Sequence, residues 1–120
     1  TMRNRWRSAW GRIAQAEYRA RLNLWRDFLE DYRNHPDANY DRFAYEVTRR
    51  VMLDLLSPEA NELPQADSQM LSGLDAILQA FFRPGNFVWD EPLEPAFPQK
   101  IFWYLYGNLP KTHHQDDQGF

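Results

Sequence analysis

Cysteine and long apolar runs are both absent from this chain, and each absence excludes a class of structure. Without cysteine, the 120 residues can form neither disulfide bonds nor zinc sites with sulfur ligands, and no thiolate is available for catalysis. No apolar stretch approaches the roughly 20 residues of a membrane-spanning helix, and no signal-peptide pattern is visible. We therefore expect a cytoplasmic protein that buries a hydrophobic core of its own.

The motifs that identify common enzyme classes are missing as well. There is no Gly-rich phosphate-binding loop, no His-Glu-x-x-His pair and no Gly-x-Ser-x-Gly turn. The acidic residues Asp90, Glu91 and Glu94 lie in a polar, proline-bounded segment, where nothing indicates the burial that a general acid requires. A solvated loop, or a counter-surface for the arginines of another copy, explains them better. We expect a protein that is not an enzyme and that binds no cofactor.

Potential metal ligands occur together only near the end of the chain, at His113, His114, Asp116 and Asp117. A metal site needs ligands that are held in place by structure and by a second layer of hydrogen bonds. The polar segment 110–120 is predicted to be a disordered tail. The sequence therefore predicts no metal site there.

Helical spacing of apolar residues dominates the rest of the sequence. The patterns predict a long helix over 3–34, a second over 39–56 that follows an N-cap at Asp37 or Asn39, and a third of about 15 residues that begins at Asp67 or Ser68. Arg83-Pro84-Gly85-Asn86 should end the third helix in a turn. The apolar run in 99–109 fits a helix or a buried strand, and we favour the helix because the chain is otherwise helical.

These elements predict an all-α single domain over 1–109, a bundle of about four helices with a long N-terminal helix. The chain holds five Trp, six Tyr and eight Phe, which suits a bulky helical core. A proline- and aromatic-rich loop over 86–98 precedes the last element. Pro92, Pro95 and Pro98 could form a polyproline II edge for an SH3-type groove, but a loop packed over the core is the better interpretation.

The apolar face of the long helix changes direction along its length. Residues from Tyr18 to Tyr32 share one face, whereas Trp6, Trp10, Ile13 and Ala14 centre about 100° away, by a count of roughly 100° per residue. We expect the first group to face the core, and Trp6, Trp10 and Ile13 of the second group to be free for a partner. A mitochondrial presequence is an alternative for the arginine-rich first 22 residues, but the helical pattern continues unbroken to Tyr32.

Arginine recurs every seven residues along the same helix, at Arg5, Arg12, Arg19, Arg26 and Arg33. The last two have Glu30 within three or four residues, whereas the first three have no carboxylate at that spacing. Residues 1–56 carry a net charge of +3 and residues 57–120 a net charge of −6. An uncompensated basic stripe indicates an anionic partner, or one part of the fold that docks on another.

Aromatic anchors beside arginine are typical of interface cores. We therefore expect a protein-interaction, assembly or adaptor domain that binds through Arg5, Trp6, Trp10, Arg12, Ile13 and Arg19. The partner is another protein or a second copy, as in a dimer. The alternative is a nucleic-acid-binding subunit of a larger complex that uses the Arg5, Arg12 and Arg19 stripe. Neither hypothesis includes a membrane or a small-molecule ligand.

Overall fold

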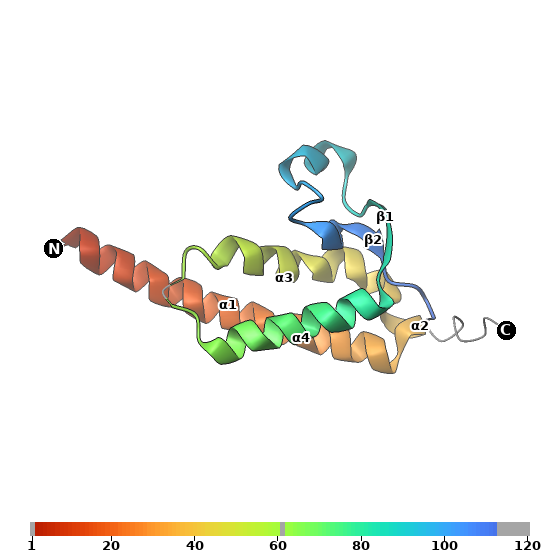
Figure 1. Ribbon diagram of the computed structural model, residues 1–120, viewed down its shortest axis with the longest axis horizontal. Helices are drawn as coiled ribbons and strands as arrows, with labels where there is room; N and C mark the ends of the chain where they lie inside the picture. Colours follow the sequence, from red (N-terminus) through yellow and green to blue (C-terminus); the bar gives the residue numbers. More distant parts are fainter. Residues whose placement is uncertain (1, 61, 113–120) are drawn as a thin grey trace.

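The computed structural model describes residues 2–60 and 62–112, with side chains from Arg5 onward. Most of it is helical, with a small sheet near the end (Figure 1). The helices are α1 (Met2–Asn34), α2 (Pro36–Asn39), α3 (Phe43–Leu56) and α4 (Gln65–Phe81), and the strands are β1 (Arg83–Phe87) and β2 (Tyr106–Asn108). Three short 3₁₀ turns complete it: η1 (Tyr40–Arg42), η2 (Glu91–Ala96) and η3 (Trp103–Leu105). None of the described helices has the length and apolar character to cross a bilayer.

The long helix α1 is the axis on which the other helices pack. It has 33 residues, against 14 in α3 and 17 in α4. Trp25 of α1 contacts Phe43 at the start of α3, and Trp10 contacts Glu59 just after its end, so α3 runs antiparallel to α1. The first turns of α1 extend past both neighbours, and the molecule measures 66 Å along its longest axis (Figure 1).

A stripe of buried residues runs straight along α1 and forms one wall of the core. Its members recur every three or four residues, as packing against other helices requires: Gly11, Ala14, Tyr18, Leu22, Trp25, Leu29 and Tyr32. The predicted separation of the two apolar groups holds for Trp6 and Ile13, which are 71% and 53% exposed, but not for Ala14, which is buried in the core stripe. The buried face itself does not rotate, however. It continues toward the N-terminus through small residues.

The second and third helices form where the patterns predict them, but their starting residues differ. The second helical region begins at Pro36, where proline suits the first turn, and not after a cap at Asp37 or Asn39. Asn39 instead stabilises the end of α1, because its side-chain amide donates to the carbonyl oxygens of Asp31 and His35 at 3.1 and 2.9 Å. Likewise α4 begins at Gln65, so neither Asp67 nor Ser68 is its cap.

The predicted helix over 99–109 is wrong, and so is the turn at Arg83-Pro84-Gly85-Asn86. Only η3 is helical there, and β2 pairs antiparallel with β1, with Arg83 opposite Asn108 and Phe87 opposite Tyr106. Gly107 makes the close pairing possible. Its φ is +155°, and an added Cβ would collide with the carbonyl oxygen of Arg83 and lie 2.6 Å from the Phe82 ring. The apolar run is therefore a turn followed by η3, which leads into β2 and closes over the core.

The proline-rich loop packs on the core through its aromatic residues, as predicted. The indole N–H of Trp89 donates to the carbonyl oxygen of Ala44 in α3 at 2.9 Å, and the Trp89 ring lies 5.3 Å from that of Phe97. Its prolines fall within or beside the 3₁₀ turn η2, not in an extended polyproline II edge. The loop therefore has a fixed position on α3.

Candidate interaction surface on the first helix

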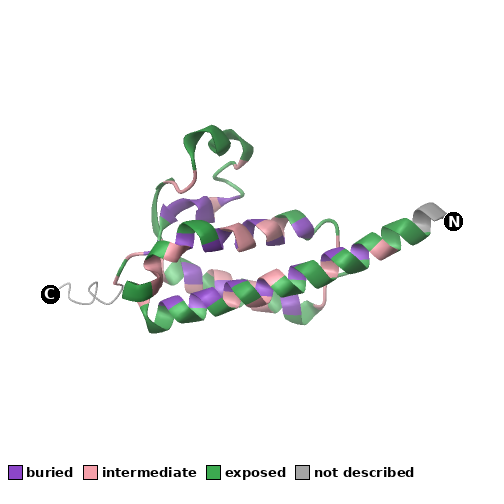
Figure 2. Ribbon diagram, turned by 180° about the vertical axis from the view of Figure 1, so that it is seen from behind, coloured by how far each residue is buried: buried purple, intermediate pink, exposed green. Residues whose placement is uncertain are grey.

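Beside its buried face, α1 carries a second apolar stripe that is exposed, which we call the outer stripe. Its members follow the alternating spacing of four and three residues that keeps them on one helix face: Trp6, Trp10, Ile13, Ala20 and Leu24. The four large members are 71, 42, 53 and 45% exposed in that order. In Figure 2, which views the molecule from behind, exposed and buried residues alternate along α1, and exposed residues prevail toward its N-terminal end.

The two stripes give α1 one buried face and one exposed apolar face from a single periodic sequence. On an ideal helix the outer stripe centres roughly 120° from the buried one, at about 100° per residue. Glu17 occupies the one charged position in the outer series and forms an ion pair with Arg21, as their spacing predicts. The pair removes an uncompensated charge from the middle of the stripe.

Trp10 is fixed by a contact with the segment after α3. Its indole N–H donates to Oε1 of Glu59 at 2.8 Å. Because the polar atom of the ring is already bonded within the chain, the exposed part of Trp10 offers only apolar surface. Of the predicted anchors, Trp6 and Ile13 are therefore the more available.

The three arginines are all exposed, but their charges are not equally free. Arg19 donates from Nε and Nη2 to Oδ2 of Asp67 at 3.3 and 3.2 Å, and the side chain of Asp67 is only 8% exposed. Arg12 donates to Ser8 Oγ at 3.2 Å, and Arg5 has no ion pair with any residue that the structure describes. The prediction that all three lack a carboxylate partner is wrong for Arg19, because its partner comes from α4 and not from its own helix.

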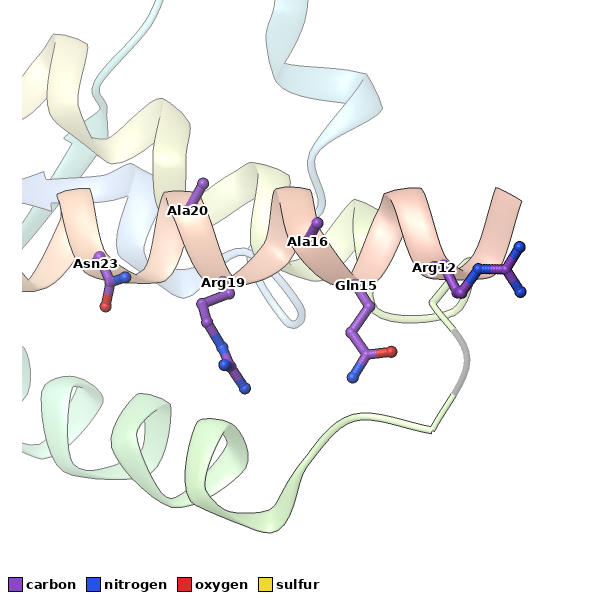
Figure 3. Close-up of a pocket in the computed structure, with 6 residues that line it drawn as sticks. All are labelled: Arg12, Gln15, Ala16, Arg19, Ala20 and Asn23. Carbon is purple, nitrogen blue, oxygen red and sulfur yellow. The ribbon is translucent and has the colours of Figure 1, made fainter. Parts of the chain in front are cut away.

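A shallow hollow of about 460 Å³ lies on α1 next to the outer stripe (Figure 3). It is lined by Arg12, Gln15, Ala16, Arg19, Ala20 and Asn23. In Figure 3, Gln15, Arg19 and Asn23 extend to one side of the helix and the two alanines to the other. The small side chains leave the backbone of α1 accessible to the close approach of another element.

Another charged cluster, centred on the buried Arg50, joins α3, α4 and η3, and the sequence analysis missed it. Arg50 of α3 donates to both carboxylate oxygens of Asp75 at 2.9 and 2.8 Å and to Asp54 at 2.9 Å. Its guanidinium lies 4.6 Å from the centre of the Tyr104 ring, and the Tyr104 hydroxyl donates to Asp54 at 2.5 Å. The four-residue spacing of Arg50 and Asp54 was the only feature of the sequence that indicated this cluster, since Asp75 and Tyr104 come from distant segments.

Electrostatics in this cluster favour a closed network. Burial alone would lower the pKa of Arg50, but hydrogen bonds to Asp75 and then Asp54 raise it above its ordinary value. Burial, followed by the hydrogen bond to Asp54, raises the pKa of Tyr104. Asp54 thus accepts hydrogen bonds from both the charged Arg50 and the neutral Tyr104. This arrangement suits a structural role, because it joins α3, α4 and η3.

No group of three or more possible metal ligands forms within the described part of the chain. The residues His113, His114, Asp116 and Asp117 lie outside it, as does most of the predicted tail. The described chain is ordered at least to Pro110, whose carbonyl oxygen accepts a hydrogen bond of 2.6 Å from the Tyr32 hydroxyl.

The chain matches no protein-family model, no curated protein and no solved structure. What its surfaces can bind must be inferred from their own residues.

Proposed function

We propose that this protein is a non-enzymatic interaction domain that self-associates through the outer stripe of α1. The observation that supports it is the exposure of large apolar side chains at helix-pairing spacing, with Trp6 at 71%. Soluble domains rarely leave contiguous apolar surface uncovered unless it is an interaction site. The stripe belongs to the longest helix, whose first turns lie clear of the rest of the fold (Figure 1).

A second copy is the partner that the stripe fits best, because the stripe is complementary to itself in size. In an antiparallel pair with a twofold axis near residue 15, Trp6 lies opposite Leu24 of the other copy. The same axis brings Trp10 opposite Ala20, so that a large ring meets a small side chain. Such an isologous contact closes as a dimer and leaves no further stripe exposed.

The first experiment compares the self-association of the wild type with that of a Trp6→Ala/Ile13→Ala variant by sedimentation velocity. Both side chains are more than half exposed, so we expect unchanged helicity by circular dichroism and association weaker by about tenfold or more, since 1.4 kcal/mol corresponds to a factor of ten. The matched control is Leu55→Ala on α3, which is also 50% exposed and should associate as the wild type does. A wild type that stays monomeric at high concentration contradicts the proposal.

Disulfide trapping tests the antiparallel geometry, and the lack of native cysteine makes the result easy to interpret. We expect Trp6→Cys and Leu24→Cys chains to cross-link to each other when mixed under oxidising conditions. A parallel pair would instead cross-link Trp6→Cys to itself, which would refute the antiparallel arrangement while leaving self-association intact.

Nucleic-acid binding by Arg5, Arg12 and Arg19 is the alternative, and the exposure of all three supports it. The bond from Arg19 to Asp67 weighs against it, because that guanidinium is already neutralised. Fluorescence anisotropy with labelled RNA and DNA at about 50 and 200 mM salt separates the two hypotheses. Binding that collapses at the higher salt would favour nucleic acid, whereas flat curves would leave the dimer.

A further inference from the structure

A second hollow, of about 430 Å³, lies beside the two-stranded sheet, between β1 and the loop that contains η2. We call it the acidic hollow. Its volume falls in the range of small-molecule sites, about 300 to 1,000 Å³. It shares no residue with the outer stripe of α1.

Three aromatic rings line the acidic hollow, those of Phe87, Trp89 and Tyr106. Phe87 lies at their centre: its ring is 5.2 Å from that of Tyr106 and 6.3 Å from that of Trp89, and the latter pair is nearly perpendicular, at 83°. Rings at a steep angle to one another form two walls of a corner, not a flat platform.

Hydrogen bonds on the protein side hold these rings in place. The indole N–H of Trp89 donates to Ala44 of α3, and the Tyr106 hydroxyl donates to the carbonyl oxygen of Phe97 at 2.6 Å. Both polar atoms are thus engaged with backbone oxygens. The rings therefore line the hollow in fixed positions, and their polar atoms are not available to a ligand.

The charged residues that line the hollow are both acidic. Glu91 and Glu94 are exposed, and neither forms an ion pair with any residue in 5–60 or 62–112. Burial raises the pKa of Tyr106, and the charge of Glu94, which lines the same hollow, raises it further. The remaining polar lining consists of the amides of Asn86 and Gln99. No lysine or arginine is among the described lining residues.

We propose that the acidic hollow binds an organic cation, either a guanidinium or an alkylammonium group. The negative faces of aromatic rings attract cations, and they favour weakly hydrated organic cations over strongly hydrated metal ions. Two unpaired carboxylates supply the opposite charge, and the side-chain amides can accept N–H hydrogen bonds. An anion would be repelled, and a neutral apolar ligand would gain nothing from the carboxylates.

The cation has two possible sources, a free small molecule or an arginine of another protein chain. The first turns of α1 in a second copy supply such arginines, and Arg5 has no ion pair of its own within the described residues. Both sources present the same chemistry to the rings and carboxylates. The experiment below distinguishes between them.

The test is a titration of the ¹⁵N-labelled full chain with N-acetyl-arginine methylamide, followed by NMR. Its neutral isostere, the citrulline analogue, is the ligand control. We expect saturable shifts confined to residues 85–106 with the arginine compound, and no saturation with the citrulline compound at roughly 50 mM. Equal binding of both compounds, or no saturable binding of either, would overturn the proposal.

A Glu91→Gln/Glu94→Gln variant should bind the arginine compound about tenfold or more weakly, because both counter-charges are lost. Asp90→Asn is the matched control, since Asp90 is an adjacent exposed carboxylate that does not line the hollow. It should bind as the wild type does, and an equal loss in this control would show a general charge effect and refute the site. All three side chains are exposed, so the spectra should keep their dispersion.

Sedimentation of the same double variant identifies the source. If self-association weakens together with arginine binding, the hollow takes an arginine from a second copy. If self-association is unchanged while arginine binding is lost, the ligand is a free cation. Both results support a cation site in the acidic hollow, and they differ only in the source of the cation.

Discussion

Replacing Arg50 by methionine is the most direct test of how the core is held together. Methionine keeps the apolar stem of the side chain but removes the guanidinium, and with it three hydrogen bonds of 2.8 to 2.9 Å to Asp54 and Asp75. The cation–π contact with Tyr104 is lost as well. What remains is a pair of carboxylates that face an apolar side chain.

The expected cost follows from how buried each partner is. Removing one member of a buried ion pair typically destabilises a protein by about 3 to 5 kcal/mol, because the other charge is left without compensation. The side chain of Arg50 is 7% exposed, but those of Asp54 and Asp75 are 31 and 23% exposed, so water can reach both carboxylates. We therefore expect the low end, about 3 kcal/mol, or roughly 10 to 15 °C in Tm.

The assay is urea denaturation followed by circular dichroism, with Arg49→Met as the control. Arg49 is the neighbouring residue in α3 and pairs with Glu46, but Glu46 keeps a second partner in Arg42, so the control should lose less than about 1 kcal/mol. Adding Asp75→Asn to Arg50→Met should recover part of the loss, because a neutral amide costs less to leave unpaired. Equal stability of the Arg50→Met and Arg49→Met variants would refute the reasoning.

Two further predictions concern a backbone position and a buried phenol. Gly107→Ala should destabilise the fold by about 2 kcal/mol or more, because the added Cβ would meet the carbonyl oxygen of Arg83. Gly73→Ala should instead stabilise the fold by about 0.5 to 1 kcal/mol, because Gly73 lies in the middle of α4 with open space around it. Thermal melts of the two variants compare these effects. Burial raises the pKa of Tyr32 to about 12, even though the charge of Arg83 opposes it. The neutral phenol is favoured in the folded state, so its contribution is complete below pH 10, the ordinary value, and about 2 to 3 kcal/mol is lost as the pH rises to about 12. Tyr32→Phe should flatten this decline in denaturation midpoints measured from roughly pH 9 to 12, and an unchanged slope would refute the assignment.

The helical part of the fold could be predicted because its signals are local. Apolar residues three and four positions apart define α1, α3 and α4, and no distant segment is needed to recognise them. The same spacing separated Trp6 and Ile13 from the core, which their exposure confirms. Their role as anchors for a partner stays a prediction.

The C-terminal segment could not be predicted in the same way. Its run of aromatic and branched residues fits a helix or a strand equally, and the deciding partner is β1, about 20 residues earlier in the chain. Pro84 and Gly85 resemble a turn locally, yet they lie at the edge of a two-stranded ladder, where proline needs no partner for its nitrogen. Pairing between distant segments overrode the local preference.

The candidate sites likewise differ in whether their contacts are local in the sequence or join distant segments. A search for carboxylates three or four residues away finds Glu17 beside Arg21, but it cannot find Asp67 beside Arg19, since the two are 48 residues apart. The acidic hollow could not be predicted from the sequence for a similar reason. Glu91 and Glu94 were visible as an acidic group, but the rings that make them a site are brought there by the sheet.

The closure of the core by the C-terminal segment has a consequence for how the chain is made. Tyr104, Leu105 and Leu109 are all buried, and Tyr32 bonds to Pro110 across 78 residues of sequence. A nascent chain in which residues 102–110 have not yet emerged therefore holds three complete helices whose apolar side chains are still exposed to water. Folding of this domain needs that segment, so translational stalling before residue 102 should yield an aggregation-prone, chaperone-dependent intermediate and not a smaller stable domain.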